Sequence, residues 1–129
     1  NGPVLACELL VDPVMLRQKV KPVKFRSFGS FPPALKDLAL VVDGNVPAED
    51  VRLAIETAAL QAADKNFIVD PVTIFDVFEG KGLGEDKKSV ACAIRFRSDD
   101  RTLEDKDVNA AFDETQRILA ETTDYALRS

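Results

Sequence analysis

Four residues on two neighbouring predicted strands have side chains that could together bind a flat, polar ligand. Residues 72–79 and 88–97 alternate in the manner of strands, and the glycine-rich stretch 80–86 between them predicts a hairpin. Side chains directly opposite each other in such a hairpin share one face of the sheet. If Glu79 pairs with Lys88 next to the loop, Phe78 lies opposite Ser89 and Asp76 lies opposite Ala91. These four side chains then share one face of the sheet.

This group favours binding of an unpaired nucleic-acid base. An aromatic ring such as that of Phe78 stacks on a base for about 1–3 kcal/mol. A carboxylate such as that of Asp76 can accept hydrogen bonds from the donors on the edge of guanine, and single-stranded RNA is recognised by stacking together with edge contacts. Lys87 and Lys88 lie where phosphates would pass. Ordinary packing of Phe78 and a surface ion pair of Asp76 are the alternatives.

The composition excludes several kinds of chemistry. The chain has 129 residues and no histidine, so no Ser-His-Asp triad or His-ligated metal site is possible. Cys7 and Cys92 are too few for a metal cage and favour two buried thiols in a cytoplasmic protein over a disulfide. The glycine-rich loop precedes a strand, whereas a phosphate-binding P-loop precedes a helix. We therefore expect no catalytic residue, metal or cofactor in this chain, and no membrane span.

The charge distribution argues against a general nucleic-acid binder. The formal net charge is −5, whereas domains that bind nucleic acids nonspecifically are usually basic. Residues 13–36 nevertheless carry six basic side chains and no acidic one, and residues 80–97 form a second basic stretch. Both stretches could simply be solvated surface.

The order of the predicted elements indicates an α+β fold. Residues 4–11 predict a strand, and 13–35, with four prolines, predict a linker. From residue 36 onward the pattern is strand, helix (47–63), strand (72–79), strand (88–97), helix (105–121) and a last short strand over 125–128. This β-α-β-β-α-β order is the ferredoxin-like split βαβ pattern, with a four-stranded antiparallel sheet and both helices on one face.

Alternation along the strands assigns side chains to the two faces of this sheet. We expect the helix-covered face to hold the larger apolar residues: Leu38, Leu40, Val42, Phe75, Val77, Val90, Cys92, Ile94 and Phe96. The open face would then hold the remainder: Ala39, Val41, Ile74, Asp76, Phe78, Ser89, Ala91 and Ala93.

Several motifs resemble one known family. The run FDVFEGKGLG over residues 75–84, followed by Lys87-Lys88-Ser89, is specific. Together with Phe31-Pro32 and the strand beginning at Lys36, it resembles the C-terminal ferredoxin-fold anticodon-binding domain of bacterial phenylalanyl-tRNA synthetase β subunits. The resemblance covers about 28–129. It implies that residues 1–27 are the end of a preceding module and a linker.

The resemblance implies a function for the open face. In that family the domain grips the anticodon stem-loop of phenylalanine tRNA, and the wobble guanine is read on the sheet. The implied RNA-binding residues are Asp76, Phe78, Ser89, Ala91, Lys87 and Lys88. Many members have tyrosine where Phe78 stands, and usually arginine where Lys36 stands. The whole enzyme would be an α₂β₂ tetramer that uses ATP and magnesium, with its catalytic chemistry in the α subunit; no DNA or membrane partner is implied.

Two other function classes fit the residues without the resemblance. A ferredoxin-like regulatory module would dimerise and bind a small molecule at the glycine-rich loop. A protein-interaction domain would use the open face of the sheet as its docking surface.

Overall fold

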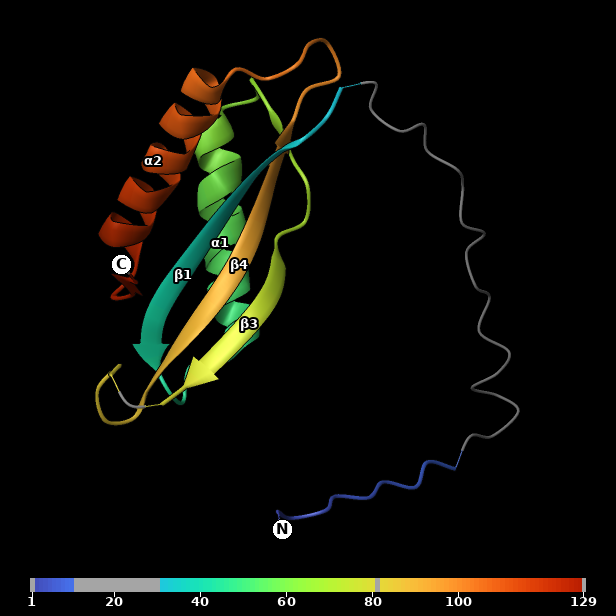
Figure 1. Ribbon diagram of the computed structural model, residues 1–129, viewed down its shortest axis with the longest axis vertical. Coiled ribbons are helices and arrows are strands. Elements are labelled where there is room, and N and C mark those ends of the chain that lie inside the picture. Colours follow the sequence, from blue (N-terminus) through green and yellow to red (C-terminus); the bar gives the residue numbers. More distant parts are fainter. Residues whose placement is uncertain (1, 11–30, 81, 129) are drawn as a thin grey trace.

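The computed structural model describes residues 2–10, 31–80 and 82–128, and the part from residue 31 onward is an α+β sandwich of one sheet and two helices (Figure 1). The predicted ferredoxin-like order is confirmed. The elements are β1 (Ala34–Asp43), α1 (Ala48–Ala63), β2 (Ile68–Val69), β3 (Thr73–Glu79), β4 (Lys87–Arg97), α2 (Asp105–Thr122) and β5 (Ala126–Leu127). In the described ranges, no helix has the length and apolar character needed to cross a membrane.

The sheet has five strands where the sequence predicted four. β4 lies in the middle and pairs with every residue of β1. β2 and β3 both pair with β4, so they must share its other side, one after the other. Asp70 and Pro71 separate them, and proline cannot donate to the ladder of backbone hydrogen bonds. The predicted strand 72–79 is β3, whereas β2 is an additional short strand that the sequence did not predict; β5 completes the opposite edge beside β1.

The core lies between the sheet and the two helices. β1 contributes Leu38, Leu40 and Val42, as the alternation predicted, and β4 contributes Val90, Cys92, Ile94 and Phe96. The helices supply the matching buried stripes, which are Val51, Ile55, Ala58, Ala59 and Ala63 from α1 and Val108, Ala111, Thr115, Ile118 and Leu119 from α2. The sheet therefore buries one face under α1 and α2, while its other face has no helix of the described chain against it (Figure 1).

A β-bulge in β3 overturns two of the predicted face assignments. Ile74 lies opposite Cys92, whereas Asp76 lies opposite Ala91, so Phe75 is an extra residue between two consecutive pairs. A bulge of this kind breaks the strict alternation of a strand. Ile74 therefore packs against the core instead of facing outward, and Phe75, expected in the core, is 56% exposed.

Other expectations outside the main fold are corrected. The predicted strand 4–11 is not a strand over residues 4–10, whose apolar side chains are exposed without the hydrogen-bonded neighbour that a strand requires. Cys7, expected to be buried, is exposed, and both cysteines are free. The predicted linker 13–35 lies mostly outside the described residues, and its end belongs to β1, because Ala34 already pairs with Phe96.

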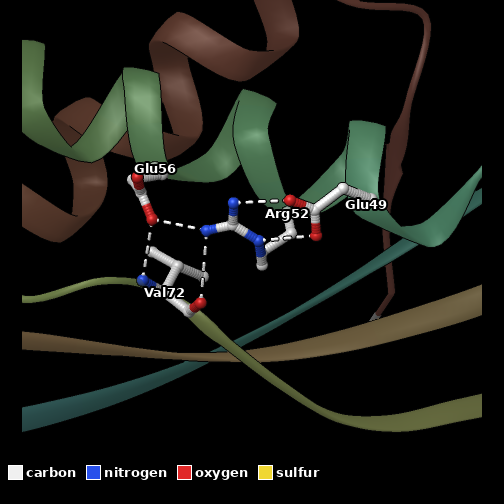
Figure 2. A network of polar contacts seen from close by, with 4 residues as sticks. All are labelled: Glu49, Arg52, Glu56 and Val72. Carbon is white, nitrogen blue, oxygen red and sulfur yellow. Dashed lines mark hydrogen bonds and ion pairs between the residues drawn. The ribbon is translucent and has the colours of Figure 1, made fainter. Parts of the chain in front are cut away.

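An ionic network ties α1 to the start of β3 (Figure 2). Arg52 contacts both Glu49 and Glu56 on its own helix, at 2.7 and 2.6 Å. Glu56 also accepts a hydrogen bond from the backbone N–H of Val72 at 3.0 Å, and Arg52 donates to the carbonyl of Val72 at 3.4 Å. The hydrogen bond between Arg52 and Glu49 favours the charged form of both side chains. It lowers the pKa of Glu49 and raises the pKa of Arg52. The network holds the segment that leads into β3.

Removing Glu56 is expected to loosen this segment. The Glu56→Ala variant leaves the buried N–H of Val72 without its acceptor, which costs about 1–3 kcal/mol. We expect a lower unfolding midpoint in urea and faster amide exchange at Val72. Glu114→Ala is the matched control, because among the described residues Glu114 pairs only with Arg117, on the surface of α2. Equal effects of the two variants would contradict the role given to the backbone contact.

The thiol of Cys92 is expected to be protected by the fold. Its burial raises its pKa from 9.0 to about 11, because the thiolate would lack hydration. The folded state favours the neutral thiol, so this contribution to stability is complete below pH 9 and is lost as the pH rises toward 11. A thiol reagent at pH 8 should label exposed Cys7 alone, and both cysteines in denaturant. Native labelling of Cys92 at the rate of Cys7 would refute this.

Candidate nucleic-acid interface

The open face of the sheet brings the four predicted side chains together. Across the β3–β4 hairpin, Asp76 lies opposite Ala91, Phe78 opposite Ser89, and Glu79 opposite Lys88, which confirms the predicted register. β1 continues the rows, with Ala39 beside Ala91 and Val41 beside Ser89. The result is a shallow surface of small residues with the carboxylate and the ring along one side.

Asp76 is the exposed acceptor on this surface. Its side chain is exposed, and no hydrogen bond or ion pair in the described part of the chain engages it. Both carboxylate oxygens are therefore available to donors of a ligand. Ala91 beside it is half-buried and presents only a methyl group, which leaves room for a flat group above the sheet.

The ring of Phe78 is held by two residues that the sequence reasoning missed. Gly80 lies at its tip, where an added Cβ would stand 2.8 Å from the Cζ atom of the ring. The guanidinium carbon of Arg128 lies 5.3 Å from the ring centroid. Phe78 and Gly80 are two residues apart, a spacing that could have indicated the first contact. Arg128 is far from Phe78 in the sequence, and no short-range pattern indicates the second contact.

Ser89 is covered in the protein as it stands. It is 2% exposed, although it belongs to the open face. It lies between Val41 and Phe78 in the sheet. Of the four predicted side chains, Asp76 and Phe78 are therefore directly accessible, Ala91 is partly accessible, and Ser89 becomes accessible only if its neighbours move.

The two predicted phosphate contacts are not equivalent. Lys87 lies at the loop end of the open face, where it forms an ion pair with Asp43. Lys88 lies opposite Val42, a core residue, so it points to the helix-covered side. Its ammonium group donates to the carbonyl oxygen of Gly44 at 2.9 Å. The structure thus keeps Lys87 near the face and turns Lys88 away from it.

A hollow beside the glycine-rich loop is acidic. It has a volume of about 490 Å³ and is lined by Asp43, Gly44, Asn45, Glu79, Asp86 and Lys87. Three carboxylates against one lysine do not suit a phosphate. Within the described ranges, no group of three or more His, Cys, Asp or Glu residues is placed to hold a metal ion.

The antiparallel sheet with both helices on one face defines a ferredoxin-fold domain. The model of the ferredoxin-fold anticodon binding domain matches residues 29–128, and the chain belongs to this family. It is 35% identical to the phenylalanine–tRNA ligase β subunit of Nitrobacter winogradskyi, over 99% of this chain and 15% of that protein. The β subunit of Hahella chejuensis is 34% identical over 100% of this chain and 15% of its own length.

A shorter match is stronger in identity. The phenylalanine–tRNA ligase β subunit of Corynebacterium glutamicum is 46% identical over 82 residues, which is 64% of this chain and 9% of that protein. The chain thus spans only about a seventh, or less, of the length of these relatives.

Proposed function

We propose that this chain binds the anticodon stem-loop of phenylalanine tRNA and reads its wobble guanine on the open face of the sheet. The observation that carries the proposal is the pairing of Asp76 with Ala91 and of Phe78 with Ser89 on a face without a covering helix. Membership of the anticodon-binding family supports an RNA ligand. The carboxylate gives the preference for guanine, because adenine does not offer the same pair of donors on that edge.

Each residue has a role in this proposal. Asp76 accepts hydrogen bonds from the guanine edge, and Phe78 stacks on the base. Ala91 and Ser89 form the floor below it. Lys87 exchanges its ion pair with Asp43 for a contact with a phosphate. Lys88 instead supports the turn between β1 and α1 through its hydrogen bond to Gly44. A shallow face of this kind suits one or two nucleotides.

We further propose that residues 28–129 act as the tRNA-positioning domain of a phenylalanine–tRNA ligase β subunit. The similarity to β subunits over the whole chain supports this. The α subunit, ATP and magnesium would then belong to the rest of an α₂β₂ enzyme. This domain contributes to aminoacylation by orientation, since holding one end of the tRNA fixes where its other end lies.

Binding of a labelled anticodon stem-loop tests the proposal. Fluorescence anisotropy compares the phenylalanine loop with the same loop carrying adenine at the wobble position, at two salt concentrations. We expect tighter binding of the guanine loop, with a preference that persists when salt weakens both. Equal binding of both loops would reject base reading. Absence of RNA binding together with dimerisation and small-molecule binding would favour the regulatory module.

A further inference from the structure

Arg128 reaches across the open face from the opposite edge of the sheet. Its backbone N–H donates to the carbonyl oxygen of Ala39 at 2.9 Å, which fixes it beside β1. Phe78 lies on β3, and β1 and β4 lie between the two. Because the guanidinium carbon is 5.3 Å from the ring centroid, the two side chains must meet above the intervening strands. Ser89 lies between Phe78 and Val41 on these intervening strands and is 2% exposed.

The contact places a cation where a base would stack. A cation over an exposed aromatic ring contributes about 0.5–1 kcal/mol. A stacked base contributes about 1–3 kcal/mol at the same ring. The base is therefore the stronger ligand for Phe78, and its arrival displaces the guanidinium without a large cost.

The displaced guanidinium would be well placed to meet a phosphate. Arg128 is exposed and its guanidinium lies over the ring, and in the described part of the chain no hydrogen bond or ion pair engages its side chain. The two lysines next to the open face already have partners: Lys87 forms an ion pair with Asp43, and Lys88 donates a hydrogen bond to the carbonyl oxygen of Gly44. Arg97, further along β4, is paired with Asp70 and Asp99. An arginine also offers the planar fork that matches phosphate oxygens.

We propose that Arg128 exchanges partners: its guanidinium covers the ring of Phe78 in the free protein and binds a backbone phosphate of the RNA once a base stacks there. Arg128 is then a phosphate-binding residue of the site, and its movement opens the surface above Ser89. The inference rests on the proposed function, because it requires an RNA whose base takes the ring.

The test compares variants in the salt dependence of binding to the guanine stem-loop. Arg128→Ala removes the cation, Arg128→Lys keeps the charge, and Arg117→Ala is the matched control. Arg117 is an exposed arginine of α2 that contacts Glu114 and Glu121. A phosphate contact to a single strand contributes about 0.7 to the slope of log affinity against log salt. We expect Arg128→Ala to lose about tenfold in affinity at low salt and about 0.7 in slope.

The other variants separate a phosphate contact from a structural one. Arg128→Lys should recover most of the slope, and Arg117→Ala should change neither quantity. In the free protein, Arg128→Ala should shift the ring proton resonances of Phe78, while the melting temperature falls by only a few degrees because the side chain is exposed. If Arg128→Ala leaves the salt slope unchanged, the inference is overturned. A rise in affinity would then mean that Arg128 only covers the ring, and a fall would mean that its role is structural.

The same data distinguish failure of the inference from failure of the proposed function. A wild-type chain that binds both loops equally, with a slope that Arg128→Ala reduces, would refute base reading and keep the phosphate contact. A guanine preference with an unchanged slope would keep base reading and refute the exchange. Lack of RNA binding by the wild-type chain would refute both.

Discussion

The Phe96→Ala variant is expected to lose about 3–5 kcal/mol of unfolding free energy, the range for removing a buried aromatic side chain. Phe96 is fully buried near the end of β4, where it pairs with Ala34 of β1 on one side and Val69 of β2 on the other. Its ring also meets that of Phe67 edge-to-face at 6.5 Å. Truncation would leave a cavity below three strands, because the surrounding backbone is tied by hydrogen bonds and cannot close over it. Urea denaturation followed by circular dichroism measures the loss.

Phe75→Ala is the matched control for this prediction. It removes the same side chain from the same sheet, but Phe75 is more than half exposed at the bulge. We expect it to retain most of the stability of the wild-type chain. If both variants were equally destabilised, the assignment of Phe75 to the outside of the core would be contradicted.

Asp76→Ala is expected to weaken binding of the guanine loop by roughly tenfold or more and to leave the adenine loop almost unchanged. Hydrogen bonds to a charged group contribute about 1.5–3 kcal/mol, and the guanine edge would lose both of its acceptors. The side chain of Asp76 is exposed, and no interaction in the described chain depends on it, so the fold should be unaffected. Anisotropy titrations with both loops give the ratio directly.

Asp76→Asn separates charge from shape in the same experiment. The amide keeps the size of the carboxylate but offers one acceptor, and its NH₂ group opposes the donors of guanine. We expect a loss on the guanine loop close to that of the alanine variant. An equal loss on both loops, in either variant, would mean that Asp76 acts through the backbone or the fold and does not read the base.

Strand periodicity predicted much of the fold and the core of the site. The alternation over 88–97 identified Val90, Cys92, Ile94 and Phe96 as the buried side of β4, because a long central strand has one unbroken period. The glycine-rich loop fixed the hairpin register, and with it the shared face of Asp76 and Phe78. Both features depend on short-range patterns, which a sequence displays directly.

The features that sequence reasoning missed depend on partners far apart in the chain. β2 is two residues long and exists only because β4 offers it free hydrogen-bonding groups beyond β3. Lys88 is an exception, because the alternation that buries Val90 already places it on the helix-covered side, and its pairing with Val42 of β1 agrees. The contact of Arg128 with Phe78 joins opposite edges of the sheet. Residues 4–10 show the converse case, where a strand-like composition pairs with no strand in the described ranges.

The bulge at Phe75 separates the shape of the surface from its chemistry. The pairs on either side of it, Ile74 with Cys92 and Asp76 with Ala91, are consecutive along β4. A chain without Phe75 would therefore form a regular ladder that presents the same side chains on the same faces. What the additional residue changes is local twist, which a bulge increases. The presence or absence of residue 75 therefore changes the curvature of the open face. The side chains that would contact an RNA loop stay the same.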